Sequence, residues 1–271
     1  MYINIWGESI EKNMLSDEDV IFLQALPINK PSVEWVWQEM DKIWYEKKLD
    51  NTKNLSKQNI GSFYSHPVWI MNGIFTATDE ESLNHRKALK NYLKSIRAKK
   101  IADYGGGSGV LADILTNDSD MNVDIIEPYP FEVFVSKHQL NSQISYLKEF
   151  ENTYYDVMIA QDVLEHVENP VETAYIISKH VKENGYIIFA NCFHPYIECH
   201  LPKTFFLRYT FTTVMQAMGL RYIGRVEGAN HALIFQRKGK LSLAKAKSAT
   251  VIARLISPSI ELAATLKRKI F

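Results

Sequence analysis

Short apolar runs alternate with segments of helical apolar spacing between residues 98 and 237. The runs predict strands, and the segments between them predict helices, because apolar residues recur there every three or four positions. This alternation is typical of a parallel sheet with helices on both faces. The predicted strands lie near 100–104, 122–127, 143–147, 155–160, 185–191, 221–226 and 231–237, with a helix near 204–218 before the last two.

The segment between the last two predicted strands is short and polar, and it contains Gly228. This pattern predicts a hairpin, which reverses the direction of one strand. We therefore predict an α/β fold with a Rossmann-like, doubly wound seven-stranded sheet that has one antiparallel edge strand.

Residues 1–97 are predicted to form a helical N-terminal extension and lid in front of this core. Ser16 with Asp19 predicts a capping box at the start of one helix, and Thr78 with Glu81 predicts another. A polar, turn-rich stretch between them predicts a loop. The predicted elements are a helix at 16–26, a helix at 33–44, a loop at 50–61 and a helix at 78–97.

The last part of the chain, residues 238–271, differs in composition. Counted from Arg237, it contains nine Lys and Arg residues against one acid, Glu261. Apolar residues lie among these charges, and Pro258 is expected to interrupt a helix. A basic amphipathic tail is typical of a segment that lies on an anionic membrane surface or docks on a partner helix. Packing on its own domain or on a homodimer mate is an equal alternative.

The overall composition excludes some classes of function. The formal net charge is +0, which gives no general attraction to nucleic acid. Cys192 and Cys199 lack metal or disulfide spacing, which is typical of a reducing compartment. The N-terminus has no secretory signal pattern, and no continuous run reaches the roughly 18 apolar residues that a membrane span requires. We expect a cytoplasmic protein with a small-molecule substrate and no nucleic-acid partner.

The run from Asp103 to Gly109 is glycine-rich and follows the first predicted core strand. Glycine accepts a left-handed backbone and lets a ligand lie against the main chain, and the following helix directs N–H groups at the turn. A dinucleotide site needs G-x-G-x-x-G/A, but Val110 stands at the third small position. Asp103, two residues before the first glycine, suits a ligand with a positive amino group, such as S-adenosylmethionine (SAM).

Two further segments stand at compatible distances. A second apolar strand ends in Glu127, 18 residues after Gly109, where such folds hold a ribose-binding acid. A later apolar run ends in Gln161 and is followed by the letters DVLEHV and then by Asn169-Pro170. Asn169 is a suitable cap for the next helix, and Pro170 suits its first turn.

Residues 98–237, about half the chain, resemble the class I SAM-dependent methyltransferases. The similar subgroup acts on small molecules and includes the ubiquinone-biosynthesis O-methyltransferases. The resemblance implies that SAM is the cofactor and that Glu127 accepts hydrogen bonds from the ribose hydroxyls. The cofactor-binding residues that it implies are Asp103, Gly105, Gly106, Gly107, Glu127, Pro128 and Gln161.

A helix starting near Gln161 would place Asp162, Glu165 and His166 on one face. Because histidine titrates near neutrality, His166 is the first candidate for a general base, with Asp162 as the second catalytic residue. The alternative is that Glu165 and His166 orient loops by hydrogen bonding.

The same carboxylate-x-x-Glu-His spacing suits a divalent metal. It resembles the small-RNA 3′-end 2′-O-methyltransferases, which use a further histidine after the fifth strand. Either His194 or His200 would complete a set with Asp162, Glu165 and His166. The sequence favours a site without a metal, because acid and histidine clusters on a helix face are usually not ligands.

The segment before the core mixes aromatic side chains with polar tips. In the resembling superfamily such segments fold over the SAM pocket and shape the substrate site, although packing of the N-terminal helices onto the core explains the aromatic residues equally well. The predicted lid and substrate residues are Tyr64, His66, Trp69, Asn72 and His194.

These patterns predict a SAM-dependent methyltransferase that acts on a hydroxyl or amine of a small molecule. The expected acceptor is a sugar or a surface-saccharide intermediate. Two alternatives stand beside this prediction, namely a metal-assisted RNA 2′-O-methyltransferase and a non-catalytic SAM-binding scaffold.

Overall fold

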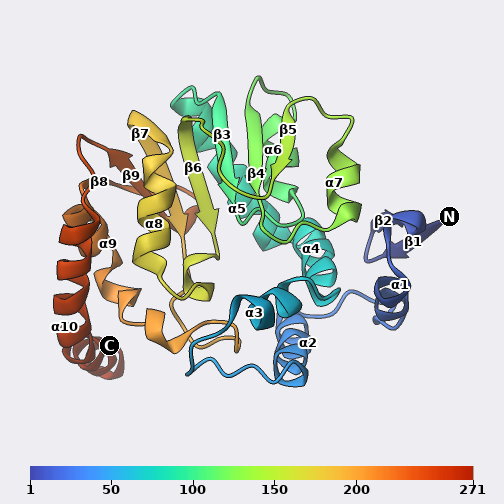
Figure 1. The fold of residues 1–271 in the computed structure, drawn as a ribbon, viewed down its shortest axis with the longest axis horizontal. Coiled ribbons are helices and arrows are strands. Elements are labelled where there is room, and N and C mark those ends of the chain that lie inside the picture. Colours follow the sequence, from blue (N-terminus) through green and yellow to red (C-terminus); the bar gives the residue numbers. More distant parts are fainter. Residues whose placement is uncertain (271) are drawn as a thin grey trace.

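The computed structural model describes residues 1–270, and it describes the side-chain surroundings of residues 1–266. Within this range the centre of the molecule is a seven-stranded sheet with the order β5-β4-β3-β6-β7-β9-β8 (Figure 1). The strands are β3 (Lys100–Tyr104), β4 (Asn122–Ile126), β5 (Ile144–Leu147), β6 (Tyr155–Gln161), β7 (Val181–Ala190), β8 (Leu220–Val226) and β9 (Ala229–Arg237).

The strand directions confirm the predicted sheet. Strands β3 to β7 pair in parallel, whereas β9 runs antiparallel to both β7 and β8. The reversed strand therefore lies one place inside the β8 edge. The hairpin that joins the two last strands turns at Gly228, whose φ is +83°.

Alternate residues of the central strands face opposite layers of helices. Met158 and Ala160 of β6 belong to an apolar cluster that includes α8 (Pro170–Lys179) and α9 (Leu207–Met218). Val157 and Ile159 belong to the cluster that includes α5 (Glu80–Ser95) and α6 (Val110–Thr116). Both faces of β6 are buried, as its unbroken apolar sequence requires. The short helix α7 (Glu132–His138) lies near β5.

The N-terminal region contains a hairpin that the sequence analysis did not predict. Strands β1 (Tyr2–Ile5) and β2 (Glu8–Glu11) pair around Trp6 and Gly7, whose φ angles are 47° and 98°. Helix α1 (Asp17–Gln24) begins with the predicted capping box between Ser16 and Asp19. Helix α2 (Val33–Glu46) follows as expected.

Three expectations for local structure were wrong. The predicted loop at 50–61 contains the start of α3 (Lys57–Tyr64), because the Ser56 hydroxyl caps it. Helix α5 is capped by Asp79, which accepts from the Ser82 N–H at 2.9 Å, and not by Thr78. Helix α8 begins at Pro170, but the Asn169 side chain makes no capping hydrogen bond.

The basic tail is one long helix, α10 (Leu243–Ile270), and it continues through Pro258. The expected interruption is therefore absent. Its segment Leu243–Leu266 is long and apolar enough to cross a membrane by length and composition, and within it an 18-residue stretch has a mean hydropathy of 1.3 with 11% of that stretch buried. The segment is not a continuous apolar run, because Arg254, Pro258 and Glu261 interrupt it.

Helix α4 (Val68–Thr78) connects the N-terminal helices to the glycine-rich turn. A Cβ placed on Gly73 would lie 2.8 Å from both Phe134 Cζ and Ser108 Cβ. A side chain at residue 73 would therefore push α4 away from the turn. Helices α2, α3 and α4 lie beyond the carboxyl ends of the parallel strands (Figure 1), which is the edge where such folds bind ligands.

Candidate active site

The glycine-rich turn follows β3 and opens onto free space at one residue. A Cβ on Gly105 would lie 2.6 Å from Val163 Cγ2, and one on Gly106 would lie 2.5 Å from Asp103 Oδ2. At Gly107, whose φ is +51°, no heavy atom lies within 4 Å of that position. The protein therefore fills the flanks of the turn and leaves the Gly107 face open, as a ligand against the backbone requires.

Glu127 lies at the end of β4 and reaches the turn. Its Oε2 accepts a hydrogen bond from the Gly107 N–H at 3.2 Å, and its Oε1 accepts one from the Tyr129 N–H at 3.0 Å. Burial raises the pKa of Glu127, and these two amide hydrogen bonds partly offset that rise. The predicted acid and the predicted turn therefore form one site. Pro128 lies between Glu127 and Tyr129 and lines a cavity beside α1.

Asp103 and Arg86 form the charged floor of the site beside the turn. Asp103 is 3% exposed, and burial raises its pKa to about 7, although the Arg86 guanidinium opposes the rise. Arg86 extends from α5 and donates to the Ser82 carbonyl at 3.1 Å through Nη1. Its buried Nε has no hydrogen-bond partner. A cation therefore lies beside two acids, Asp103 and Asp162.

The segment after β6 does not form the expected helix from Gln161. Gln161 is the last residue of β6, and Asp162 takes a left-handed φ of 52° while its N–H donates to the Ala190 carbonyl at 2.7 Å. A single 3-10 turn, η2 (Leu164–His166), follows. Asp162 is exposed to solvent, and desolvation by neighbouring protein atoms raises the pKa of its carboxyl.

Glu165 is completely buried in η2. Its Oε1 accepts from the Cys192 N–H, and its backbone carbonyl accepts from the Leu201 N–H at 2.9 Å. Its Oε2 has no hydrogen-bond partner. Burial, and secondarily the charge of Asp162, raises the pKa of Glu165.

His166 and His200 lie side by side, and their ring centroids are 4.8 Å apart. The Nδ1 of His166 is 3.1 Å from the Cys199 carbonyl, and the Nδ1 of His200 is 2.6 Å from the His194 carbonyl. Because a carbonyl only accepts, both Nδ1 atoms carry the proton and both Nε2 atoms keep a lone pair. Burial lowers the pKa of His166 to about 3 and also lowers that of His200. Both rings are therefore neutral at physiological pH.

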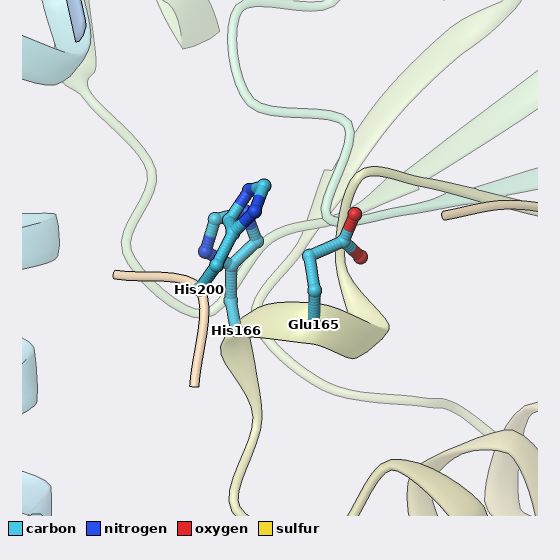
Figure 2. A group of neighbouring side chains, drawn as sticks. All are labelled: Glu165, His166 and His200. Atoms are coloured by element: carbon cyan, nitrogen blue, oxygen red, sulfur yellow. The ribbon is translucent and has the colours of Figure 1, made fainter. Parts of the chain in front are cut away.

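Glu165, His166 and His200 each offer a ligand atom, and these atoms lie within 4.8 Å of one another (Figure 2). Figure 2 shows Glu165 and His166 on the same 3-10 turn and the His200 imidazole beside that of His166. One carboxylate and two neutral imidazoles are a donor set that suits a divalent cation, and hydrogen bonds to Nδ1 orient histidine ligands in such sites. Glu165 and His166 of the predicted metal set are therefore neighbours, and His200 is the third group beside them, whereas Asp162 and His194 do not belong to this group. Metal binding here stays a prediction.

The predicted lid residues divide into two groups. Tyr64 and Trp69 are packed together with a centroid distance of 4.9 Å, and Trp69 meets His166 edge-on at 6.4 Å. His66 lies elsewhere: its Nδ1 accepts from the Val68 N–H at 3.1 Å, and its ring meets Phe22 of α1. His66 therefore packs within the N-terminal region. Tyr64 and Trp69 also pack there, on Phe63 at centroid distances of 5.3 and 5.5 Å, although Trp69 contacts His166 as well. Their role as a lid stays a prediction. Asn72 is half-buried on α4.

His194 lies in the segment after β7, where it faces aromatic neighbours. Its ring stacks on Tyr196 at 5.3 Å, and Tyr196 stacks on Trp37 of α2 at 5.6 Å. This series of three rings joins the segment after β7 to the N-terminal extension. It forms an aromatic wall near the histidine pair, because the His194 carbonyl contacts His200.

Unpartnered buried polar atoms concentrate around this site. In residues 1–266 they include Tyr64 Oη, Trp69 Nε1, Arg86 Nε, Glu165 Oε2, and both side-chain polar atoms of Asn191. Buried polar groups in native proteins are nearly always hydrogen-bonded, so a cluster of unpartnered ones indicates a place where a ligand supplies the partners. Asn191 directly follows β7.

Some of these residues were outside the set of predicted site residues. Arg86 has no sequence signal, because one arginine in a long amphipathic helix is usually exposed. Tyr129, which stacks on Tyr64 at 5.9 Å, could have been found from its position two residues after Glu127. The assignments of roles to Asp162 and His166 stay predictions.

Comparison with known proteins agrees with this geometry. A family model described as a methyltransferase domain matches residues 79–217, just over half of the chain. The chain therefore belongs to the methyltransferase domain family, and its fold and turn place it in the class I SAM-dependent group.

Curated relatives and solved structures extend the comparison. A ubiquinone biosynthesis O-methyltransferase of Hydrogenovibrio crunogenus is 23% identical over 52% of this chain and 63% of its own length. One of Rickettsia typhi is 29% identical over 50% of this chain and 60% of its own. The chain thus spans less than two thirds of these relatives.

Two solved structures share the fold. An O-methyltransferase family protein from Burkholderia thailandensis matches 79% of this chain and 75% of its own, with a TM-score of 0.51 at 13% identity. The mitomycin 7-O-methyltransferase matches 77% of this chain and 69% of its own, with a TM-score of 0.51 at 14% identity.

The raised pKa of Asp103 predicts a pH-dependent stability. A buried carboxyl with a folded-state pKa near 7 favours unfolding increasingly as pH rises from its ordinary value of 3.8. We expect Asp103→Asn to remove this loss. The melting temperature of the variant minus that of the wild type should grow between about pH 4 and about pH 7 and then level off.

Thermal unfolding followed by tryptophan fluorescence at a series of pH values measures this difference. Asp118→Asn is the control, since Asp118 is exposed and its left-handed φ of 50° suits asparagine equally well. A melting-temperature difference between Asp103→Asn and the wild type that stays constant or shrinks as pH rises would contradict a raised pKa of Asp103.

Proposed function

We propose that this chain transfers the methyl group of SAM to a hydroxyl of a small molecule. One observation carries the proposal: the open Gly107 face lies between the Glu127 carboxylate and a floor that contains Asp103 and Arg86. An acid, a bare backbone and a cation–acid pair match the ribose, the sulfonium region and the amino-acid end of the donor, respectively. The names of the curated relatives, which are O-methyltransferases, support oxygen as the acceptor atom.

The donor-binding roles follow from the charges. Glu127 accepts hydrogen bonds from the two ribose hydroxyls, since its oxygens already accept from N–H groups at the turn. Arg86 binds the donor carboxylate through its unpartnered guanidinium nitrogen, and Asp103 faces the ammonium group. SAM supplies a methyl group on a positively charged sulfur, which an oxygen nucleophile displaces in line.

Asp162 is the better proton acceptor of the two predicted catalytic residues. Desolvation raises the pKa of Asp162 toward neutrality, whereas burial lowers the pKa of His166 to about 3. A base works best when its pKa lies near the working pH. Asp162 is therefore assigned to take the proton of the acceptor hydroxyl, whereas the Nε2 of His166 is assigned as a cation ligand together with Glu165 and His200.

The acceptor site is proposed between the lid and the aromatic wall. Tyr64 and Trp69 close one side, and the stack of Trp37, Tyr196 and His194 closes the other. Flat rings with polar groups at their edges suit a sugar or a surface-saccharide intermediate. The formal net charge of +0 favours such a molecule over RNA, and the unpartnered groups at the site favour turnover over a non-catalytic scaffold. The assignment to the cytoplasm stays a prediction.

We expect wild-type protein to bind S-adenosylhomocysteine and Gly107→Ala to bind it at least about tenfold more weakly. The new methyl group would occupy the open face of the turn. Isothermal titration calorimetry measures both affinities. Gly239→Ala is the matched control, because Gly239 also has a positive φ, +70°, with nothing within 4 Å of its Cβ position. Equal loss in both variants, or no binding by the wild type, would refute the donor site.

The acceptor is tested with SAM labelled on its methyl group. We expect label to enter a hydroxylated small-molecule or saccharide fraction of a cell extract in the presence of the protein. We expect Asp162→Asn to slow this transfer at least about a hundredfold, the usual share of a general base, while binding of S-adenosylhomocysteine stays within about threefold. Label that enters only RNA would establish the alternative acceptor instead.

Glu165, His166 and His200 are proposed to hold a divalent transition cation such as Mn²⁺. One carboxylate oxygen and two neutral imidazole nitrogens form a donor set that such ions accept. A cation there would place positive charge beside the acceptor oxygen and favour its ionised form. The Cys192 N–H and the two carbonyls behind the histidines fix the three side chains in this arrangement.

Titration of Mn²⁺ followed by electron paramagnetic resonance tests the cation site. We expect one ion per wild-type chain and at least about tenfold weaker binding by His200→Ala. His231→Ala is the control, because His231 also lies beside a histidine, His85, with a centroid distance of 4.6 Å. Equal affinity of the wild type and His200→Ala would exclude this set.

A further inference from the structure

The face of α10 that touches the protein consists of small side chains. Ala246, Ala253 and Ser257 are 0%, 3% and 7% exposed, and the helix packs along α9 and α8. A helix that only covers its own domain turns its large apolar residues inward. In α10 the fully buried side chains are the small ones, whereas most of the large apolar residues are exposed.

The large apolar side chains of α10 face away from the protein. At 100° per residue, Val251, Leu255, Leu262 and Leu266 fall on one side of the helix, opposite Ala246 and Ala253. They form an outer apolar face together with Ile252 at its border. The exposed fractions are 61% for Val251, 59% for Ile252, 75% for Leu255, 63% for Leu262 and 53% for Leu266. A continuous apolar face of this kind marks an interaction surface.

Positive charges border the outer apolar face. Lys247 and Arg254 lie along one border and Lys245 along the other, by the same helical spacing. Lys247 is 3.6 Å from Glu172 of α8, and Arg254 lies over the Phe206 ring at 4.7 Å. Glu261 is the one acid in the sequence of α10, and it faces Arg208 of α9 at 3.5 Å. The sequence continues with three more cations, Lys267, Arg268 and Lys269.

Helix α10 also leads toward the candidate active site. The Ser242 N–H donates to the Met218 carbonyl at the end of α9, whereas Glu261 meets Arg208 near the start of α9. The two helices are thus antiparallel, and the second half of α10 lies at the end of the sheet where β7 leads into the residue 192–202 segment (Figure 1).

We propose that α10 lies in the headgroup region of an anionic lipid bilayer. Its outer apolar face inserts among the acyl chains, and the bordering lysines and arginine contact the lipid phosphates. Apolar area and attraction of cations to anionic lipid are the two contributions that hold such helices at a membrane surface.

The charge pattern favours lipid over a second copy of the chain. A two-fold interface through the outer apolar face would bring identical basic borders together, and the sole acid of α10 already faces Arg208. Crossing the bilayer would require α10 to leave α9 and expose Ala246 and Ala253, which are now buried. A surface position keeps the whole packed face in place.

The test uses the full-length protein and sedimentation with vesicles of phosphatidylcholine alone or mixed with phosphatidylglycerol. We expect binding to the mixed vesicles, weaker binding at high salt, and little binding to phosphatidylcholine alone. We expect Leu255→Asp/Leu262→Asp to bind at least about tenfold more weakly. Both leucines are exposed, so this variant should fold.

The matched control is Ile28→Asp/Leu140→Asp, which adds the same charges at residues that are 97% and 99% exposed away from α10. A second pair of variants compares Lys245→Glu in α10 with Lys87→Glu in α5. We expect only Lys245→Glu to weaken vesicle binding, by at least about fivefold, because the loss of one cation near an anionic surface has about this effect. These measurements need neither donor nor acceptor, so their outcome is independent of the proposed activity.

Three results would overturn the proposal. The first is that wild-type protein does not sediment with anionic vesicles. The second is a dimer in sedimentation velocity that Leu255→Asp/Leu262→Asp abolishes, with no vesicle binding, because the outer apolar face would then belong to a second copy. The third is binding that resists both high salt and alkaline carbonate, which would indicate a membrane-crossing helix.

Discussion

The hydrogen bond from the Gly107 N–H to the Glu127 carboxylate joins the two halves of the proposed donor site. It requires β3 and β4 to be neighbours, so that the glycine-rich turn and the acid leave the sheet at the same edge. It also requires a bare backbone in the turn, because atoms of Val163 and Asp103 occupy the places where side chains of Gly105 and Gly106 would lie. The strand order and the glycines are therefore both required for the hydrogen bond between Gly107 and Glu127.

Several charged side chains are buried together at the candidate active site. Asp103, Asp162 and Glu165 all have raised pKa values because burial disfavours their ionised forms. Arg86 offsets part of this cost for Asp103 and Asp162, whereas only backbone hydrogen bonds offset the rise in the pKa of Glu165. Burying several acids near one cation lowers the free energy of unfolding. This arrangement is typical of a binding site, where bound groups supply the missing partners.

Much of the sheet was predictable, because its signal is local. The unbroken apolar sequence of β6 and the Gly228 hairpin both appear as predicted. The segment after β6 was predicted wrongly, because Asp162 takes a left-handed φ that brings its N–H to the Ala190 carbonyl. That hydrogen bond depends on a strand later in the chain. No helical spacing rule contains this information.

Long-range contacts also explain why the neighbours of His166 and the position of Arg86 could not be predicted from the sequence. His200 stands beside His166 only because the segment after β7 folds back and donates from Leu201 N–H to the Glu165 carbonyl. Arg86 enters the site only because α5 packs beneath the sheet. The predicted lid residues differ in their contacts: Trp69 contacts both Phe63 and His166, whereas the His66 ring nitrogen accepts from the Val68 N–H at the start of α4. Residue type alone did not separate these cases.

The close contact of α4 with the glycine-rich turn couples two events. Gly73 rests against Ser108, and Trp69, one turn earlier on the same rigid helix, meets His166 edge-on. A helix of this length moves as a rod, so it cannot uncover the acceptor compartment while staying fixed against the donor loop. In the proposed function, a movement of α4 that opened the acceptor side would therefore also displace it from the donor turn, which couples the two compartments mechanically.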